Sequence, residues 1–324
     1  MSLVPAGATT RLLGALAAVL ALVLAGCGGG GDEQGSGGSA PAPGFPVTIP
    51  HAFGQTTVPT KPTRVVTVGY NDADFALALG TVPVGVRDFI GAFDETTRPW
   101  AQQALNGARP EMVGGNEIDI EKVASLQPDL ILGVYSYMDR ATYDRLSQIA
   151  PTVADPVENV AAPWQEQTRI TARALGVPER GEQVVGDVER RFADARTANP
   201  QFAGKNIAVA LVASGEYNLL GRDDARTQVF TGLGLGVQET TETLSTEQLG
   251  RLDQQGVAVL GVPPQVALSN PLFANLGAVR ANRVAFLGDE ASPVAGALGF
   301  SSPLSLPYAL DQITPELARV YGTT

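Results

Sequence analysis

The sequence has little of the side-chain chemistry that builds thiol and imidazole sites. It contains one cysteine and one histidine in 324 residues. A single cysteine excludes an intrachain disulfide. A single histidine, His51, excludes a zinc or manganese site made of several imidazoles. A histidine-based catalytic centre would have to use His51, which we interpret as a structural or surface residue.

Basic residues are also scarce. The chain has 22 Lys and Arg against 33 Asp and Glu, a formal net charge of −11. A surface that coats nucleic acid needs clustered basic residues, so we expect no nucleic-acid partner. Hydrophobic residues make up 44% of the chain, enough for a sizeable core. The length suits two ordinary domains or one protein with two lobes.

No apolar run is long enough to span a membrane. The longest, at 12–25, has fourteen apolar or glycine residues after Arg11, whereas a membrane helix needs about 20. A run of this length fits the apolar core of a secretory signal. It ends in the sequence LAGC, which resembles the lipobox of bacterial lipoproteins, with the only cysteine where the lipid would attach. We expect a signal peptide at 1–26 and a lipidated Cys27; the alternative is a secretory signal with an incidental cysteine.

A flexible segment follows the cysteine. Residues 27–44 are rich in glycine, serine and proline and nearly lack apolar side chains, a composition typical of a loose tether. We therefore expect a soluble, extracytoplasmic domain that is held at the cell membrane through its lipid anchor alone.

Strand and helix patterns alternate in the remaining chain, which is typical of open parallel sheets. A β-hairpin is expected at 45–58, with Gly54 in the turn, and Asp72 is a candidate N-cap. The expected strands are 64–69, 82–86, 130–134 and 206–213. The expected helices are 72–79, 97–106, 119–126, 139–149, 164–175 and 179–198. These patterns predict an N-terminal α/β lobe at 45–160, a bridging helical segment at 161–198 and a C-terminal α/β lobe at 199–324.

An internal repeat supports two related lobes. Residues 119–126 and 245–252 share a capping residue, a glutamate two positions later and a final leucine, and each is followed by a Leu-Gly-Val strand end. The shared glutamates are Glu121 and Glu247. The alternative is that any two βα units look alike at this level.

The order of several short segments carries a family resemblance. They are KPTRVV at 61–66, LQPDLI at 126–131, APTV at 150–153, ALG at 174–176, LSTEQL at 244–249 and SPLSLP at 302–307. In this order and spacing the chain resembles the solute-binding lipoproteins of ABC importers for ferric siderophores, haem and cobalamin, and the siderophore branch fits best.

This resemblance implies an α/β fold of the class III periplasmic-binding-protein type, with two Rossmann-like lobes bridged by a long helix. It implies a monomer without catalysis or a cofactor. The protein would capture a ferric siderophore in the cleft between the lobes and deliver it to an ABC permease with its ATPase. It also implies that Glu121 and Glu247, one on each lobe, dock onto permease arginines; the alternative for each is a solvated helix face.

Loops after predicted strands supply the candidate cleft residues, because ligands of open α/β sheets bind beyond the carboxyl ends of the strands. Tyrosines suit a bulky, oxygen-rich chelate, and arginines pair with anionic oxygens. The candidates are Tyr70, Arg87, Tyr135, Tyr137, Tyr217 and Arg222, with Trp100 and Phe300 as core or cleft wall. For each tyrosine the alternative is packing under a loop, and for the arginines a surface ion pair.

Other functions are less well supported by the sequence. The Gly-x-Ser-x-Gly motif is absent, and the glycines at 232, 234 and 236 lack the spacing of a dinucleotide-binding loop. A haem- or cobalamin-binding protein of the same architecture and a transporter-independent sensor lipoprotein stay open. The sequence does not distinguish among hydroxamate, catecholate and carboxylate siderophores as the ligand.

Overall fold

Two five-stranded sheets dominate the structure, a computed structural model that describes residues 44–88, 97–299 and 301–322. The first sheet has the order β5-β4-β3-β6-β7 and its pairs are all parallel. The second has the order β10-β9-β8-β11-β12, in which β9 is antiparallel to both of its neighbours. The strands are β3 (Val65–Thr67), β4 (Gly85–Val86), β5 (Glu111–Met112), β6 (Leu130–Leu132), β7 (Thr152–Val153), β8 (Ile207–Ala213), β9 (Glu216–Leu220), β10 (Glu242–Leu244), β11 (Gly256–Gly261) and β12 (Val284–Asp289).

Both sheets arrange their strands in the same sequence. Numbered along the chain within each sheet, the strands lie in the order third, second, first, fourth, fifth, the order of a Rossmann-type half. Strand β3 therefore corresponds to β8, and β6 corresponds to β11. This topology confirms the predicted two-lobed α/β fold.

Helices cover the sheets. They are α1 (Asp72–Ala78), α2 (Gln102–Leu105), α3 (Ile120–Ser125), α4 (Arg140–Ser147), α5 (Trp164–Ala174), α6 (Pro178–Ala198), α7 (Gln228–Gly232), α8 (Pro264–Leu268), α9 (Pro271–Ala274), α10 (Gly277–Arg280), α11 (Pro293–Gly299) and α12 (Ser305–Tyr321), with the 3-10 helices η1 (Pro200–Phe202), η2 (Ala225–Thr227) and η3 (Thr246–Leu252). In the part of the chain that the structure describes, no helix has both the length and the apolar character to cross a bilayer.

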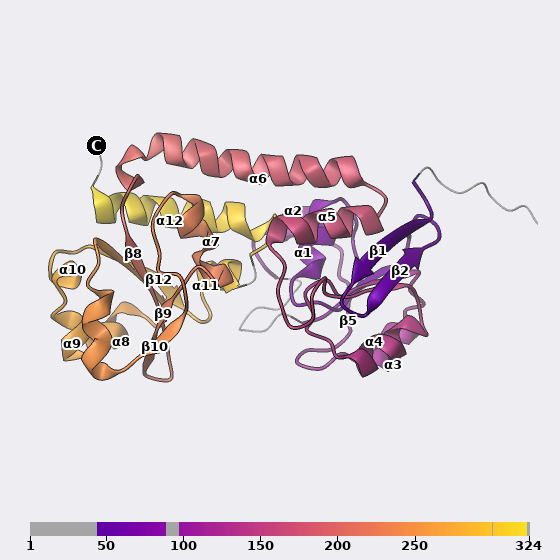
Figure 1. Cartoon of the computed structure of the whole chain (residues 1–324), viewed down its shortest axis with the longest axis horizontal. Helices are drawn as coiled ribbons and strands as arrows, with labels where there is room; N and C mark the ends of the chain where they lie inside the picture. The colour runs from indigo at the N-terminus through magenta and orange to yellow at the C-terminus, as the bar shows by residue number, and fades with distance from the viewer. Residues whose placement is uncertain (1–43, 89–96, 300, 323–324) are drawn as a thin grey trace, which may run out of the picture. The chain divides into compact units, whose positions relative to one another are not determined.

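Helix α6 is the predicted bridge. It has 21 residues and begins at Pro178, whose fixed φ and missing N–H suit the first helical position. The apolar positions that recur at helical spacing, among them Val184, Val188 and Phe192, are its buried ones. We call each five-stranded sheet with the helices that cover it an α/β unit. The helix packs on α5 of the first unit and on α12 of the second (Figure 1).

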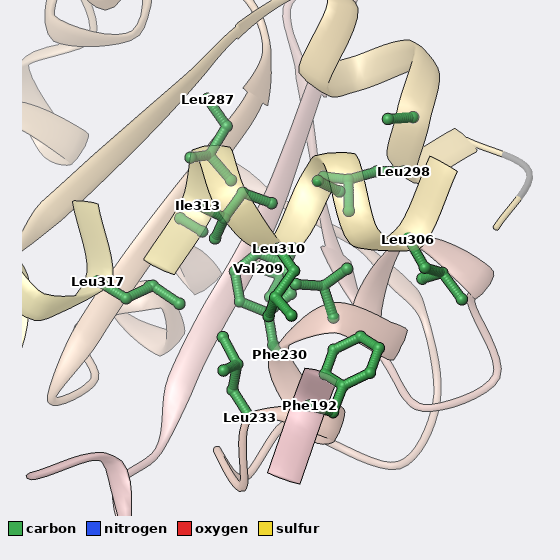
Figure 2. Close-up of a cluster of buried hydrophobic side chains, with 14 of the residues drawn as sticks. Phe192, Val209, Phe230, Leu233, Leu287, Leu298, Leu306, Leu310, Ile313 and Leu317 are labelled. Carbon is green, nitrogen blue, oxygen red and sulfur yellow. The ribbon is translucent and has the colours of Figure 1, made fainter. Parts of the chain in front are cut away.

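One hydrophobic core is shared by the two α/β units. A cluster of buried side chains runs from Phe75 of α1 through Phe192 of α6 to Leu306 and Leu310 of α12, and Figure 2 shows the part around Phe192 and α12. Because the cluster includes side chains from both units, these units are joined by packing as well as by the chain. The exact lobe boundaries given above stay predictions.

The N-terminal hairpin pairs β1 (Val47–His51) with β2 (Gly54–Val58). The turn lies at 52–53, and Gly54 begins β2 instead of forming the turn, which corrects the expectation for this glycine. The buried His51 ring confirms a structural role. Its Nδ1 accepts the Phe53 N–H at 3.2 Å, and its Nε2 lies 3.0 Å from the Thr56 hydroxyl.

Candidate ligand-binding cleft

A cavity of about 1260 Å³ lies where the two sheets present the carboxyl ends of their first and fourth strands. Leu211 of β8 and Leu260 of β11 line it from the second unit, and Tyr135, after β6, lines it from the first. Phe192 of the bridging helix completes the wall. This is the position that open α/β sheets favour for ligands.

The loops after β3 and β6 bring three predicted tyrosines together. The ring centroids of Tyr70 and Tyr135 are 5.9 Å apart, those of Tyr70 and Tyr137 6.2 Å, and those of Tyr135 and Tyr137 5.1 Å. Tyr135 and Tyr137 line the cavity, and Tyr137 is 41% exposed. Burial, and then the hydrogen bond with Tyr137, raise the pKa of the Tyr135 phenol, so its hydroxyl stays protonated. The cluster offers aromatic faces and hydroxyl groups to a ligand.

A buried carboxylate, Asp155, fixes the backbone that carries these tyrosines. It accepts the Ser136 N–H at 3.0 Å, the Ser136 hydroxyl at 2.8 Å and the Tyr137 N–H at 3.3 Å. Tyr137 has a φ of 52°, in the left-handed region that a non-glycine residue adopts only at a cost. The hydrogen bonds of Asp155 offset that cost and hold the Tyr137 side chain in the cavity wall.

A second buried carboxylate, Asp72, lies behind the same loop. Asp72 was expected to cap α1; it is instead the first residue of the helix, after Asn71, and its Oδ2 accepts the Val134 N–H at 2.8 Å. Complete burial, and then the negative charge of Asp155, raise the pKa of Asp72 to about 7. A Cβ at Gly69 would lie 2.3 Å from Asp72 Oδ2, which explains the glycine at this position.

Arg87 supports the tyrosines from behind and does not line the cavity, which corrects the prediction of a ligand contact. It is 4% exposed. Its guanidinium donates to the carbonyls of Gly115 and Asn116, each at 2.6 Å, and to the Tyr70 hydroxyl at 3.3 Å. It also lies 4.2 Å from the centroid of the Tyr70 ring. Arg87 thus holds Tyr70 by a hydrogen bond and a cation–π contact.

Tyr217 lies in the core of the second unit and not in the cavity wall, which corrects its prediction as a ligand contact. The chain turns back after β8 into the antiparallel strand β9, where Tyr217 pairs with Val212 near the carboxyl end of β8. Its side chain nevertheless packs into the buried cluster that contains Phe273. The Tyr217 hydroxyl donates to the Ala267 carbonyl at 3.2 Å, and its ring packs against Phe273. A position just after a predicted strand does not show on which face of the sheet the side chain packs, which is why Tyr217 was assigned to the cavity.

The two tryptophans differ in position. Trp100 is buried and its Nε1–H donates to Asp74 Oδ2 at 2.8 Å, so it belongs to the core, one of the two alternatives given for it. Trp164, which was not among the candidates, lines the cavity. In the sequence, its position at the start of a helix that follows a strand was a signal that it could face the cleft. Phe300 lies outside the described residues, as does Cys27.

Three arginines line the cavity from the bridge and the second unit. Arg222 lies there as expected, with its Nε 3.4 Å from Glu239 Oε1. The sequence reading missed Arg226, which forms a two-point ion pair with Asp224, and Arg196, which donates to the Gly232 carbonyl at 2.6 Å. A ligand contact of Arg222 stays a prediction.

Glu121 and Glu247 occupy equivalent places. Each is exposed and is the second residue of a helix that precedes the fourth strand of its sheet, β6 or β11. The Asp119 carboxylate caps the first helix by accepting the Lys122 N–H, and Ser245 forms a capping box in the second. One helix is α and the other is 3-10, yet the predicted pairing of the two glutamates agrees with the shared topology.

The described residues contain no cluster of three or more His, Cys, Asp or Glu side chains that could hold a metal ion.

Comparison with known proteins assigns the architecture to a family. A model described as periplasmic binding protein matches residues 65–256. The chain belongs to the periplasmic binding protein family. This membership agrees with the expectation of a binding protein and not an enzyme.

Relatives and a solved structure extend this likeness. The chain is 28% identical over 205 residues to a probable siderophore-binding lipoprotein, YfiY, of Bacillus subtilis, a match that covers 62% of this chain and 60% of that protein. It is 26% identical to the iron(3+)-hydroxamate-binding protein YxeB of the same organism, over 95% of this chain and 96% of that one. A periplasmic solute binding protein from Mycobacterium smegmatis is 36% identical with a TM-score of 0.78, over 85% of this chain and 99% of that one.

Proposed function

We propose that this protein is an extracytoplasmic solute-binding lipoprotein that captures a ferric siderophore in its cleft and delivers it to an ABC permease. The tyrosine-lined cavity between the two α/β units is the observation that carries the proposal. Two relatives named for siderophore or ferric-hydroxamate binding support it.

The chemistry of the wall suits an iron chelate better than a bare ion. Tyr135, Tyr137 and Trp164 offer ring faces to the organic shell, and amide side chains such as Gln167 offer hydrogen bonds. The siderophore would already satisfy the coordination of the iron, so the protein need only recognise the outside of the complex.

The shared core favours a cleft that is built before the ligand arrives. The contacts of α6 with α5 and α12, and the buried cluster that also includes Phe75 of α1, restrict the motion of one unit against the other. We therefore propose that binding changes the cleft little, and that the permease distinguishes the loaded protein by the ligand it presents as well as by its surface.

Delivery would use Glu121 and Glu247 as a two-point dock. Their exposed positions at matching places on the two sheets support this role, since paired like charges on one partner and arginines on the other give electrostatic complementarity. Lipidation at Cys27 would keep the protein beside the permease, in line with the lipoprotein named among its relatives.

Uptake of radio-labelled iron tests this function. Cells that lack the gene are complemented with the full chain or with a Cys27→Ala variant, and ferric-siderophore uptake is measured. We expect the full chain to restore uptake and the Cys27→Ala variant to restore much less, because the protein is no longer retained at the membrane. If deletion leaves the uptake of every ferric siderophore unchanged, the proposed function is wrong.

A further inference from the structure

The charges on the cavity wall point to a class of ligand. The described lining residues include three arginines and four carboxylates, and no lysine. The arginines are Arg196, Arg222 and Arg226, and the carboxylates are Glu189, Asp223, Asp224 and Glu290. The wall is therefore slightly acidic, although a protein that holds a polyanion usually presents an excess of arginine or lysine.

The arginines are already engaged. The Arg226 guanidinium donates through Nε and Nη2 to the two carboxylate oxygens of Asp224, and the Asp224 side chain is only 14% exposed. If Arg226 turned to bind an anionic ligand, the largely buried Asp224 carboxylate would lose its ion-pair partner, which costs free energy. Arg196 donates to the Gly232 carbonyl. Arg222, half exposed beside the exposed Glu239, is the arginine that a ligand could recruit at small cost.

The buried Arg87, behind the tyrosines, adds no free positive charge to the wall. Arg87 directs its donors to main-chain carbonyls and to the Tyr70 hydroxyl.

Uncharged polar groups are plentiful in the same wall. Amides and hydroxyls line the cavity between the aromatic rings; they are Asn71, Gln165, Gln167, Gln228, Thr231 and Ser301. Such groups hydrogen-bond to neutral carbonyl and N–O oxygens without requiring a charged partner.

From these observations we propose that the cavity selects ferric chelates that carry no net negative charge, of the trihydroxamate type, against catecholate and citrate chelates. Three hydroxamates each lose one proton and neutralise the ferric ion, whereas three catecholates each lose two and leave a trianion. A trianion would meet an acidic wall in a partly water-excluded cavity, where repulsion is stronger than in bulk water. The inference deepens the proposed function and rests on it.

Calorimetric titration of the full mature chain tests the selection. The probes are ferrioxamine B, which is cationic, ferrichrome, which is neutral, and ferric enterobactin and ferric citrate, which are anionic. We expect both hydroxamates to bind at least about tenfold more tightly than either anionic chelate, with a difference that shrinks as salt is raised. An anionic chelate that binds as tightly as the hydroxamates would overturn the selection and leave the proposed function standing. If no ferric chelate binds, both the selection and the proposed function fail.

A pair of variants locates the cause. Asp224→Asn removes one negative charge and releases Arg226, while its side-chain oxygen can still accept the Arg226 N–H that starts η2. Glu290→Gln is the matched control, because it removes the same charge without releasing an arginine. We expect Asp224→Asn to tighten ferric enterobactin binding by about tenfold, to change ferrioxamine B by less than about twofold, and to exceed the gain from Glu290→Gln. If both variants tighten ferric enterobactin binding equally, release of Arg226 from Asp224 does not contribute to the selection. If neither variant tightens it, charge is not the basis of the selection.

Discussion

Asp74 and Ser302 join the two α/β units through a buried hydrogen bond, in which the Ser302 hydroxyl donates to Asp74 Oδ2 at 2.7 Å. Asp74 lies on α1 and also accepts the Trp100 Nε1–H, while its Oδ1 lies 3.0 Å from Arg98 Nη1. Ser302 precedes α12, and its hydroxyl oxygen accepts the Ser305 N–H at 3.0 Å. A single polar cluster thus ties the start of α12 to the first unit.

Removing this link should destabilise the whole chain. Ser302→Ala deletes a buried partner of the Asp74 carboxylate and the acceptor of the Ser305 N–H at the start of α12, so we expect the free energy of unfolding to fall by about 1–3 kcal/mol in urea titrations. Ser269→Ala is the control, because the exposed Ser269 hydroxyl donates only to a carbonyl within its own turn; its effect should stay within about 0.5 kcal/mol. Equal stability of the two variants would show that the cluster does not couple the units.

The tyrosine loop should depend on Asp155. Asp155→Asn replaces a charged acceptor of three hydrogen bonds by a neutral amide, which weakens the support of the left-handed Tyr137 backbone. We expect ferrioxamine B affinity to fall by about tenfold with a smaller loss of stability. Asp144→Asn, at an exposed position on α4, is the control. Unchanged affinity in Asp155→Asn would contradict a positioning role for this carboxylate.

The pH dependence of stability should report the buried Asp72. Its pKa is raised to about 7 in the folded chain, far above the value of about 3.9 in unfolded chains, so the folded state binds the extra proton between these values. Stability therefore falls as pH rises from about 4 to about 7, with a slope of at most about 1.4 kcal/mol per pH unit for this group. Burial also raises the pKa of Asp155, which acts in the same direction.

Chemical denaturation of wild type and Asp72→Asn across this pH range checks the assignment. The amide oxygen can still accept the Val134 N–H but does not titrate, so the variant should show a flatter stability profile than wild type. Parallel profiles would mean that Asp72 titrates near its ordinary value.

Reversal of the paired glutamates should separate delivery from capture. In Glu121→Lys with Glu247→Lys we expect iron uptake to be lost, while ligand affinity stays within about twofold, because both residues are exposed and neither lines the cavity. Glu166→Lys with Glu179→Lys is a matched control, since these exposed glutamates also lie in first helical turns and carry the same helix-dipole cost. Wild-type uptake by the first double variant would rule out the dock.

Sequence patterns could predict the architecture because continuous β-branched runs and helical periodicity are local. The parallel strands, the long helix α6 and the tyrosines after β3 and β6 all follow from such runs. The face on which a side chain packs depends on how its strand pairs, which is not local, so Tyr217 was assigned to the wrong face of the second unit.

The hydrogen-bond partners of the buried charged side chains could not be predicted from the sequence either. Nothing near Arg87 in the chain shows that Gly115 and Asn116 would bind its guanidinium, or that Asp72 and Asp155 would hold the loop at 133–138. These contacts form between residues that only folding brings together, and they decide which predicted residues face the ligand.

The most direct test of capture in the cleft is calorimetric titration with ferric hydroxamates, haem and cobalamin. It compares wild type with two variants, each of which shortens one exposed side chain. Tyr137→Ala removes a 41% exposed ring from the cavity wall, and Leu272→Ala removes a 50% exposed side chain outside it. We predict that wild type binds a ferric hydroxamate and neither haem nor cobalamin, that Tyr137→Ala weakens this binding by at least about tenfold, and that Leu272→Ala leaves it unchanged. Binding of haem or cobalamin alone, or full affinity in Tyr137→Ala, would contradict the account.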